Sequence, residues 1–267
     1  MNTATTTRRW KRPPFIKNPT LRWGLWLGLG IYLALAFGTM EVDWGRVAEG
    51  AERGKRFIAA FFPPDFTSRW DSILDGILES LWMTITSTVV GILLSIPVGL
   101  GAARNLSSRP VYLFCRGVLA VSRTFPEIIL AIFFVKLFGF GPFAGFLALS
   151  VGTIGFYGKL LAEDIEDMDP VQAEAIKSVG AGWLQWLNYA VQPQVMPRMI
   201  GLGIYRLDIN FRESAVVGIV GGGGIGATLL TSFDRYEFDS AAAILLVIIG
   251  IVMAMEYSSG YIRKWVQ

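Results

Sequence analysis

The sequence predicts an all-α polytopic membrane protein with six transmembrane helices and with both termini in the cytoplasm. Of its 267 residues, 53% are hydrophobic and only 17% are charged, whereas soluble domains carry about 25% charge. The mean hydropathy is also high, at +0.49. Six apolar segments follow one another along the chain, and a helix needs about 20 such residues to cross a bilayer.

The six predicted spans differ in how continuous they are. They lie at residues 23–40, 77–100, 111–140, 143–161, 199–220 and 240–257. The first span follows a basic tail without a small-residue cleavage site, so we expect an uncleaved helix rather than a signal peptide. Arg123 and Pro126 interrupt the third span. Because proline ends helices, Pro126 predicts that a cytoplasmic helix stops there before the true span begins.

Basic residues near the span ends predict the orientation. They gather in the N-terminal tail (1–22), in the connection after the second span (Arg104 and Arg109) and in the C-terminal tail (258–267). Six spans place these three segments on one side of the membrane. The positive-inside rule makes that side the cytoplasm.

Two long connections separate the spans. Residues 41–76 mix acids with bases, and we expect an external amphipathic segment that ends at Pro63 and Pro64. The connection 163–198 lies within the predicted five-helix core, 77–257. It is expected in the cytoplasm as short helices, with a start at Asp169-Pro170 and a stop at Gly180.

The residue inventory argues against an enzyme. The chain has one cysteine, Cys115, and no histidine, so we expect neither a catalytic group nor a metal site. A membrane-embedded enzyme would need clustered acids or histidines at the end of a span, whereas the acids of this sequence are scattered. No Gly-x-x-x-x-Gly-Lys-Ser/Thr loop is present, so ATP hydrolysis needs another polypeptide.

The fifth span carries unusual polarity. Its charged residues are Arg206, Asp208, Arg212 and Glu213. Two interpretations stay open. The set neutralises itself and holds helices together, with Asp208 and Arg212 pairing four residues apart. Alternatively, part of the span lines an anion pathway. The candidate pathway residues are Arg206, Asn210, Arg212 and Ser214.

A cytoplasmic motif resembles that of permeases of ATP-binding-cassette (ABC) importers. Those permeases carry Glu-Ala-Ala, three residues, Gly, nine residues, a branched apolar residue, any residue, Leu and Pro. The matching residues here are Glu174, Ala175, Gly180 and Pro193, with departures at Ile176, Ala190 and Gln192. The resemblance implies that this segment couples the permease to a separate ATPase, which would bind ATP and Mg, as a rigid body.

A glycine-rich stretch is similar to one at the outer end of a core span in methionine- and phosphonate-type permeases. The matching glycines are Gly221, Gly223, Gly224 and Gly226. We expect an outer gate or close helix packing here. No soluble strand precedes the stretch, which disfavours a nucleotide-binding loop.

Residues 61–66, 141–145 and 193–197, with Arg206 and Arg212, resemble the phosphonate importer permease (PhnE) family. The resemblance implies the type I ABC importer permease fold in a bacterial inner membrane. It also implies a homodimer with two ATP-binding subunits and a periplasmic or extracellular substrate-binding protein. The expected function is import of phosphonates or related phosphorus oxyanions by alternating access, with no cofactor in this chain.

Three alternatives remain. A phosphite or hypophosphite importer permease shares every feature above. A methionine-type amino-acid permease shares the glycine stretch. A non-ABC secondary transporter would show inverted repeats and broken helices with midplane carboxylates, and the sequence shows no repeat.

Overall fold

The computed structural model describes residue 16, residues 18–40 and residues 43–266, with side chains described as far as Tyr261. Within these ranges the chain forms helices and no strand. It divides into two units, residues 1–58 and 59–267, which are described separately. Most of the predicted N-terminal tail lies outside the described residues.

The first unit holds two helices of opposite character. Helix α1 (Pro19–Thr39) starts at Asn18, whose side chain accepts a hydrogen bond from the Thr20 amide at 3.2 Å, which satisfies a free N–H at the helix start. It is long and apolar enough to cross a membrane. Helix α2 (Trp44–Ala59) is strongly amphipathic, as the sequence predicts, and ends before the two prolines.

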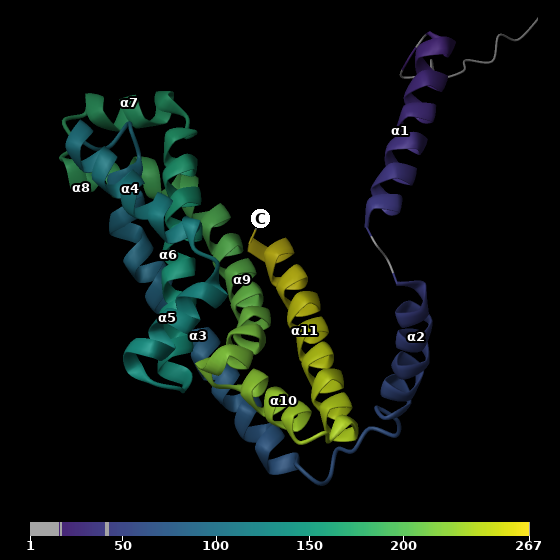
Figure 1. The fold of residues 1–267 in the computed structure, drawn as a ribbon. Helices are drawn as coiled ribbons and strands as arrows, with labels where there is room; N and C mark the ends of the chain where they lie inside the picture. Colours follow the sequence, from purple (N-terminus) through teal and green to yellow (C-terminus); the bar gives the residue numbers. More distant parts are fainter. Residues whose placement is uncertain (1–15, 17, 41–42, 267) are drawn as a thin grey trace, which may run out of the picture. The chain divides into compact units, whose positions relative to one another are not determined.

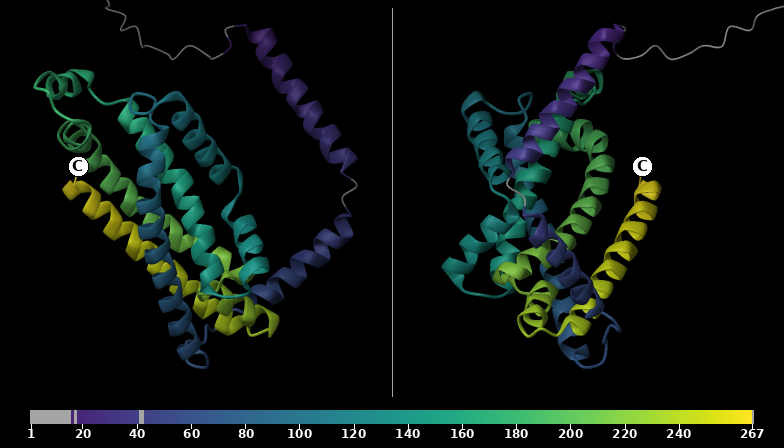
Figure 2. Two further views of the ribbon diagram at one scale, coloured as in Figure 1. Left: turned by 90° about the vertical axis from the view of Figure 1, so that its left-hand side faces the viewer. Right: turned by 45° about the vertical axis from the view of Figure 1, so that its right-hand side comes forward.

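The second unit is a helical bundle (Figures 1 and 2). Its long helices are α3 (Trp70–Ala102), α6 (Pro142–Glu166), α9 (Gln192–Val217) and α11 (Phe238–Val266). Shorter helices are α4 (Arg109–Thr124), α5 (Glu127–Phe138), α7 (Pro170–Ser178), α8 (Trp183–Trp186) and α10 (Ile225–Asp234). Two π-helical turns, η1 (Leu187–Val191) and η2 (Gly218–Gly222), flank α9. Helix α11 runs through most of the segment expected to be a C-terminal tail.

The six predicted spans appear as four continuous helices and two bent pairs. Helices α1, α3, α6 and α11 each contain a window apolar enough to cross a membrane. Helices α4 and α5 meet at 91°, and the break falls at Phe125-Pro126 because proline lacks the amide N–H that would continue the helix. This confirms the predicted interruption. The second pair is the helix Trp183–Gly222 with α10, bent by 55°.

Small residues let α3 and α6 approach closely along their lengths. A Cβ atom added at Gly91 of α3 would lie 2.5 Å from the Thr153 Cβ of α6. One at Gly99 would lie 3.0 Å from the Gly158 carbonyl oxygen. Buried serines such as Ser95 fill the same seam. Close contact of small residues is how helices gain packing energy in lipid, where apolar burial supplies little.

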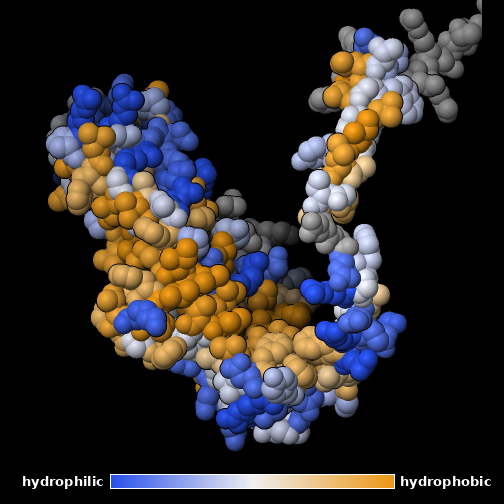
Figure 3. Space-filling view, viewed as in Figure 1, coloured by the Kyte–Doolittle hydropathy of each residue, from blue (hydrophilic) through white to orange (hydrophobic). Residues whose placement is uncertain are grey.

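The bundle has two polar ends and an apolar middle. Figure 3 shows a broad hydrophobic band across the core unit with hydrophilic side chains above and below it. Helices α7 and α8 lie at one end, and α10 lies at the other (Figure 1). Helix α9 connects the two ends, so it is placed to transmit a movement at one end to the other end.

Candidate functional site

The segment between α6 and α9 forms two short helices at one end of the bundle. Asp169 starts α7 by accepting a hydrogen bond from the Val171 amide at 2.9 Å. Helix α7 stops at Ser178, and Gly180 takes a positive φ of +81°, a conformation that glycine adopts without strain. The predicted start and stop are both confirmed. We call residues 170–186 the α7–α8 segment.

The α7–α8 segment is held together by its tryptophan. The buried Trp186 indole N–H donates to the Ala173 carbonyl at 3.0 Å, and the Lys177 ammonium lies 4.4 Å from the centre of the Trp186 ring. Ala173 and Trp186 belong to the same apolar cluster as Ile165 of α6. The two short helices are therefore joined to each other and to the bundle.

The motif residues of this segment, and Pro193 at the start of α9, face outward. Glu174, Ala175, Gly180 and Pro193 are all exposed. Apolar side chains beside them are also exposed: Val179 by 79%, Leu184 by 66% and Trp183 by 56%. An exposed apolar group of this kind, next to a charged residue, is typical of a surface that another protein covers.

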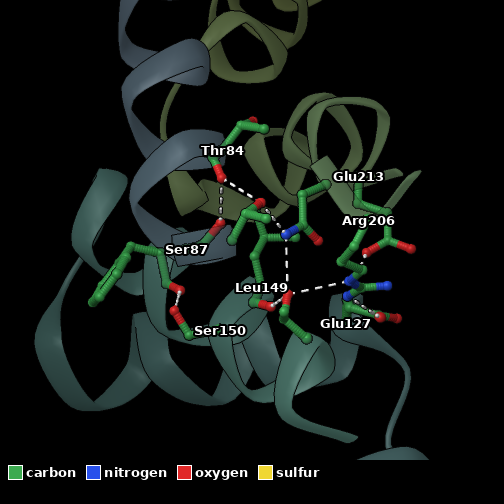
Figure 4. A network of polar contacts seen from close by, with 11 residues as sticks. Thr84, Ser87, Glu127, Leu149, Ser150, Arg206 and Glu213 are labelled. Atoms are coloured by element: carbon green, nitrogen blue, oxygen red, sulfur yellow. Dashed lines mark hydrogen bonds and ion pairs between the residues drawn. The ribbon is translucent and has the colours of Figure 1, made fainter. Parts of the chain in front are cut away.

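A buried polar network crosses the middle of the bundle (Figure 4). At its centre is Arg206 of α9, which is only 3% exposed. Its guanidinium lies 3.2 Å from the Glu127 carboxylate of α5 and 3.7 Å from that of Glu213. Its Nε donates to the Thr153 hydroxyl of α6 at 3.1 Å. We call these residues, with Asn210 and Thr88, the Arg206 network.

Asn210 extends the Arg206 network to α3. Its side-chain amide donates to Thr88 at 2.8 Å and to Thr153 at 3.0 Å. Each threonine hydroxyl donates in turn to a backbone carbonyl of its own helix, at Thr84 and Leu149. Both amide hydrogens of Asn210 and both threonine hydroxyls therefore have acceptors, whereas the buried Asn210 Oδ1 has no partner. These bonds connect α3, α6 and α9.

The other two candidate pathway residues lie apart from this centre. Arg212 pairs with Asp208, as the spacing predicts, and the Arg212 side chain is 46% exposed. The Ser214 hydroxyl is buried and donates to the Phe211 carbonyl at 2.7 Å. The charged residues of the fifth predicted span are two bases and two acids, with a formal charge of zero. Glu127 adds a third acid to this set, so its formal charge is −1. The sequence does not reveal this partner, because Glu127 lies 79 residues from Arg206.

The glycine-rich stretch forms a tight turn at the opposite end of α9. We call residues 218–226 the glycine turn. Gly221, Gly223 and Gly224 have φ values of +97°, +78° and +73°, which side chains disfavour. A Cβ atom on Gly226 would lie 1.9 Å from the Ala215 carbonyl oxygen. In this conformation the turn is closely packed, and α10 begins directly after it.

Two backbone amides of the glycine turn donate hydrogen bonds to side chains of α3, one of which is a carboxylate. The Gly224 N–H donates to the Glu79 carboxylate of α3 at 3.0 Å, and the Ile225 N–H donates to the Ser80 hydroxyl at 2.9 Å. A helix start favours negative charge, which Glu79 supplies to α10. Glu79 lies near the start of the second predicted span, 77–100, and no local pattern pairs it with residues 145 positions away.

No group of three metal-ligating side chains occurs among the described residues. The described residues therefore offer rigid packing, a buried ion-pair network and the exposed α7–α8 segment. In the described part of the chain, four helices and two bent helix pairs are long and apolar enough to cross a membrane.

Comparison with known proteins identifies the family. Residues 95–267 match the family described as "Binding-protein-dependent transport system inner membrane component", and the chain belongs to that family. The phosphite transport system permease protein PtxC of Stutzerimonas stutzeri is 41% identical over 250 residues, which cover 90% of each chain. The phosphate-import permease protein PhnE of Mycolicibacterium smegmatis is 44% identical over 203 residues, 76% of this chain but 38% of that relative.

Solved structures agree on the fold. A structure described as an inward-facing conformation of the MetNI methionine ABC transporter superposes with a TM-score of 0.67 at 22% identity, covering 75% of this chain and 99% of that one. The predicted all-α fold of an ABC importer permease is confirmed. The cytoplasmic location of the two termini stays a prediction.

Proposed function

We propose that this chain is the membrane-spanning permease subunit of an ATP-driven importer for phosphonates or related phosphorus oxyanions. The observation that carries the proposal is the 41% identity to a phosphite permease across 90% of both chains. Phosphite and hypophosphite stay within the same proposal, because their shared chemistry is a small phosphorus oxyanion.

We propose four partners for the chain, with the bacterial inner membrane as its location. Two ATPase subunits bind ATP and Mg, an external binding protein delivers the anion, and a second copy of this chain completes the pathway. The α7–α8 segment supports the ATPase contact. Its exposed Glu174 sits beside the exposed Val179 and Trp183, on a body braced by Trp186.

The transport mechanism that we propose is alternating access, with this chain acting as a transport subunit and ATP hydrolysis residing in the partner. Rigid coupling requires a continuous element from the ATPase contact to the outer end. The helix that starts at Trp183 supports this proposal, because it continues through η1 and α9 as far as Val220, where the non-helical Gly221 ends it. The glycine turn, with Gly221, Gly223, Gly224 and Gly226, is the proposed outer gate.

The charges of the candidate pathway divide between two roles. Arg206 is buried against two carboxylates, and the surplus acid repels an anion, so we assign Arg206 and Asn210 to holding the helices together. Arg212 also pairs with an acid, Asp208, but 46% of its side chain is exposed. We assign to it the weaker, electrostatic role of lowering the barrier for an anion.

Uptake by proteoliposomes that contain this chain, its ATPase and its binding protein tests the proposal. A phosphonate, phosphite, phosphate and D-methionine would be compared with and without ATP. ATP-dependent uptake of phosphonate or phosphite is the expected result. Uptake that proceeds without ATP would instead identify a secondary transporter, and uptake of D-methionine alone would identify a methionine-type permease, as in the 27% identical protein of Pasteurella multocida.

A further inference from the structure

We propose that helix α2 is an interfacial helix, which lies in the headgroup layer of the membrane with its apolar side toward the acyl chains. The proposal concerns lipid binding and is independent of which substrate the protein carries. Its starting point is a one-sided distribution of apolar residues. Trp44, Val47, Ala51 and Ile58 share one side of the helix, because their spacings of 3, 7 and 14 residues are close to whole helical turns.

The apolar side of α2 has no partner within the described part of its unit. None of the α2 residues is buried. Trp44 is 71% exposed, Ile58 is 62% exposed and Val47 is 50% exposed. Fully burying such a side chain is worth about 1.5–3 kcal/mol, so a row of them left in water would be costly. Something apolar must cover this side in the working protein.

The rest of α2 is mostly charged and has a positive balance, although by the same spacing Lys55 falls on the apolar side and Phe57 falls on the charged one. Between Trp44 and Ala59 the helix holds four bases, Arg46, Arg53, Lys55 and Arg56, and two acids, Glu49 and Glu52. Arg53 pairs with Glu49 at 2.7 Å, and Lys55 pairs with Glu52 at 3.7 Å. The net charge of +2 complements the phosphates of lipid headgroups. A basic polar side opposite a Trp-containing apolar side is typical of interfacial helices.

Chain connectivity keeps α2 at the membrane surface. Helix α1 is apolar enough to cross the membrane and ends at Thr39, and α2 begins five positions later at Trp44. Those five steps span at most about 18 Å. Helix α2 itself has 16 residues, about 24 Å of helix, which is too short and too charged to cross the hydrocarbon. Its first turn therefore starts near the headgroups.

Trp44 indicates that lipid, rather than another protein, covers the apolar side of α2. Tryptophan is enriched where a chain leaves the hydrocarbon, because its ring is apolar and its N–H is polar. Trp44 is the first residue of α2, next to the end of a span, on the same side as Val47 and Ala51. The bilayer is thus the nearest apolar phase to this side of the helix.

Site-directed spin labelling of the full-length protein in lipid vesicles tests the proposal. The one native cysteine is removed by Cys115→Ala, and nitroxide labels are placed at Val47→Cys and Ala51→Cys. Arg53→Cys, on the charged side of the same helix, is the matched control. Collision rates are measured with oxygen, which concentrates in lipid, and with a water-soluble nickel chelate.

The expected result is an oxygen-to-nickel collision ratio several-fold higher at 47 and 51 than at 53, with labels 47 and 51 about 5–10 Å below the phosphates. Equal ratios at all three positions would mean that α2 stands in water. Labels at 47 and 51 shielded from both reagents would mean that protein covers this side. Either result overturns the proposal.

Discussion

The Arg206 guanidinium of α9 lies 3.2 Å from the carboxylate of Glu127, the first residue of α5. This pair joins the helix that follows the Pro126 break to the helix that connects the two ends of the bundle. The Glu213 carboxylate lies 3.7 Å from the same guanidinium nitrogen, Nη2. One buried cation thus serves two carboxylates on two helices.

Arg206→Met should lower stability strongly, because it leaves two acids facing each other without a cation. Breaking a fully buried pair costs about 3–5 kcal/mol, and the partial exposure of Glu127 and Glu213 reduces this to about 2–3 kcal/mol. Glu127→Gln is the matched control and should cost less than about 1 kcal/mol, since Glu213 still neutralises Arg206. Thermal unfolding in detergent measures both, and equal losses would contradict the central role of Arg206.

Gly226→Ala should disrupt the glycine turn, because the new methyl group would meet the Ala215 carbonyl oxygen. Overpacking of this kind costs about 1–3 kcal/mol or more. Gly250→Ala in α11, where nothing lies within 4 Å, should leave stability unchanged or raise it by about 0.5–1 kcal/mol. The melting temperature should therefore fall in Gly226→Ala and stay the same or rise in Gly250→Ala. An unchanged melting temperature in Gly226→Ala would show that the turn is loosely packed.

Gly180→Ala should weaken coupling to the ATPase more than it weakens the fold. The φ of +81° at this position costs a side chain about 1–2 kcal/mol, and no neighbouring atom lies within 4 Å of the added methyl group. Substrate uptake per ATP hydrolysed should fall while the melting temperature changes by a few degrees.

Glu174→Gln on the exposed side of α7 should also lower that uptake ratio, with no change in melting temperature. Unchanged uptake ratios in both variants would remove the α7–α8 segment from the proposed coupling role.

Asp65 predicts a pH effect confined to strongly acidic conditions. Its carboxylate accepts hydrogen bonds from the side chains and amides of Ser68 and Thr67, which lowers the pKa of Asp65 well below its ordinary value of 3.8. A carboxyl group whose pKa is lower in the folded state than in the unfolded state stabilises the fold when the pH is above the unfolded-state pKa. This stabilisation is lost as the pH falls through the folded-state pKa.

The melting-temperature difference between wild type and Asp65→Asn should therefore be constant from neutral pH down to about pH 5. It should shrink below about pH 4, where the unfolded carboxyl binds protons. A difference that changes between pH 5 and 7 would contradict this assignment.

Local patterns predicted the elements that depend on nearby residues. Hydropathy located the spans, Pro126 located a break, and Asp169 with Gly180 located the ends of α7. The i,i+4 spacing of Asp208 and Arg212 predicted their pairing. Each of these follows from a few adjacent positions, where residue type and helix geometry suffice.

Pairings between distant helices could not be predicted in this way. Glu79 has no feature that selects Gly224 as its partner, and Thr88 and Thr153 resemble the other hydroxyls of their helices. Arg206 signalled the need for an acid, but Glu213 lay closer in sequence than Glu127. Choosing among such partners requires the helix register, which depends on packing of α3 and α6 along their whole length.

The continuous helix around α9 has a mechanical consequence. It is held at one end by the α7–α8 segment and fastened near its middle by Arg206 and Asn210, and the glycine turn follows its far end. A helix that pivots about an attachment near its middle acts as a lever, so its two ends move in opposite directions by similar amounts. We therefore expect an inward displacement of the α7–α8 end to produce an outward displacement of the glycine-turn end.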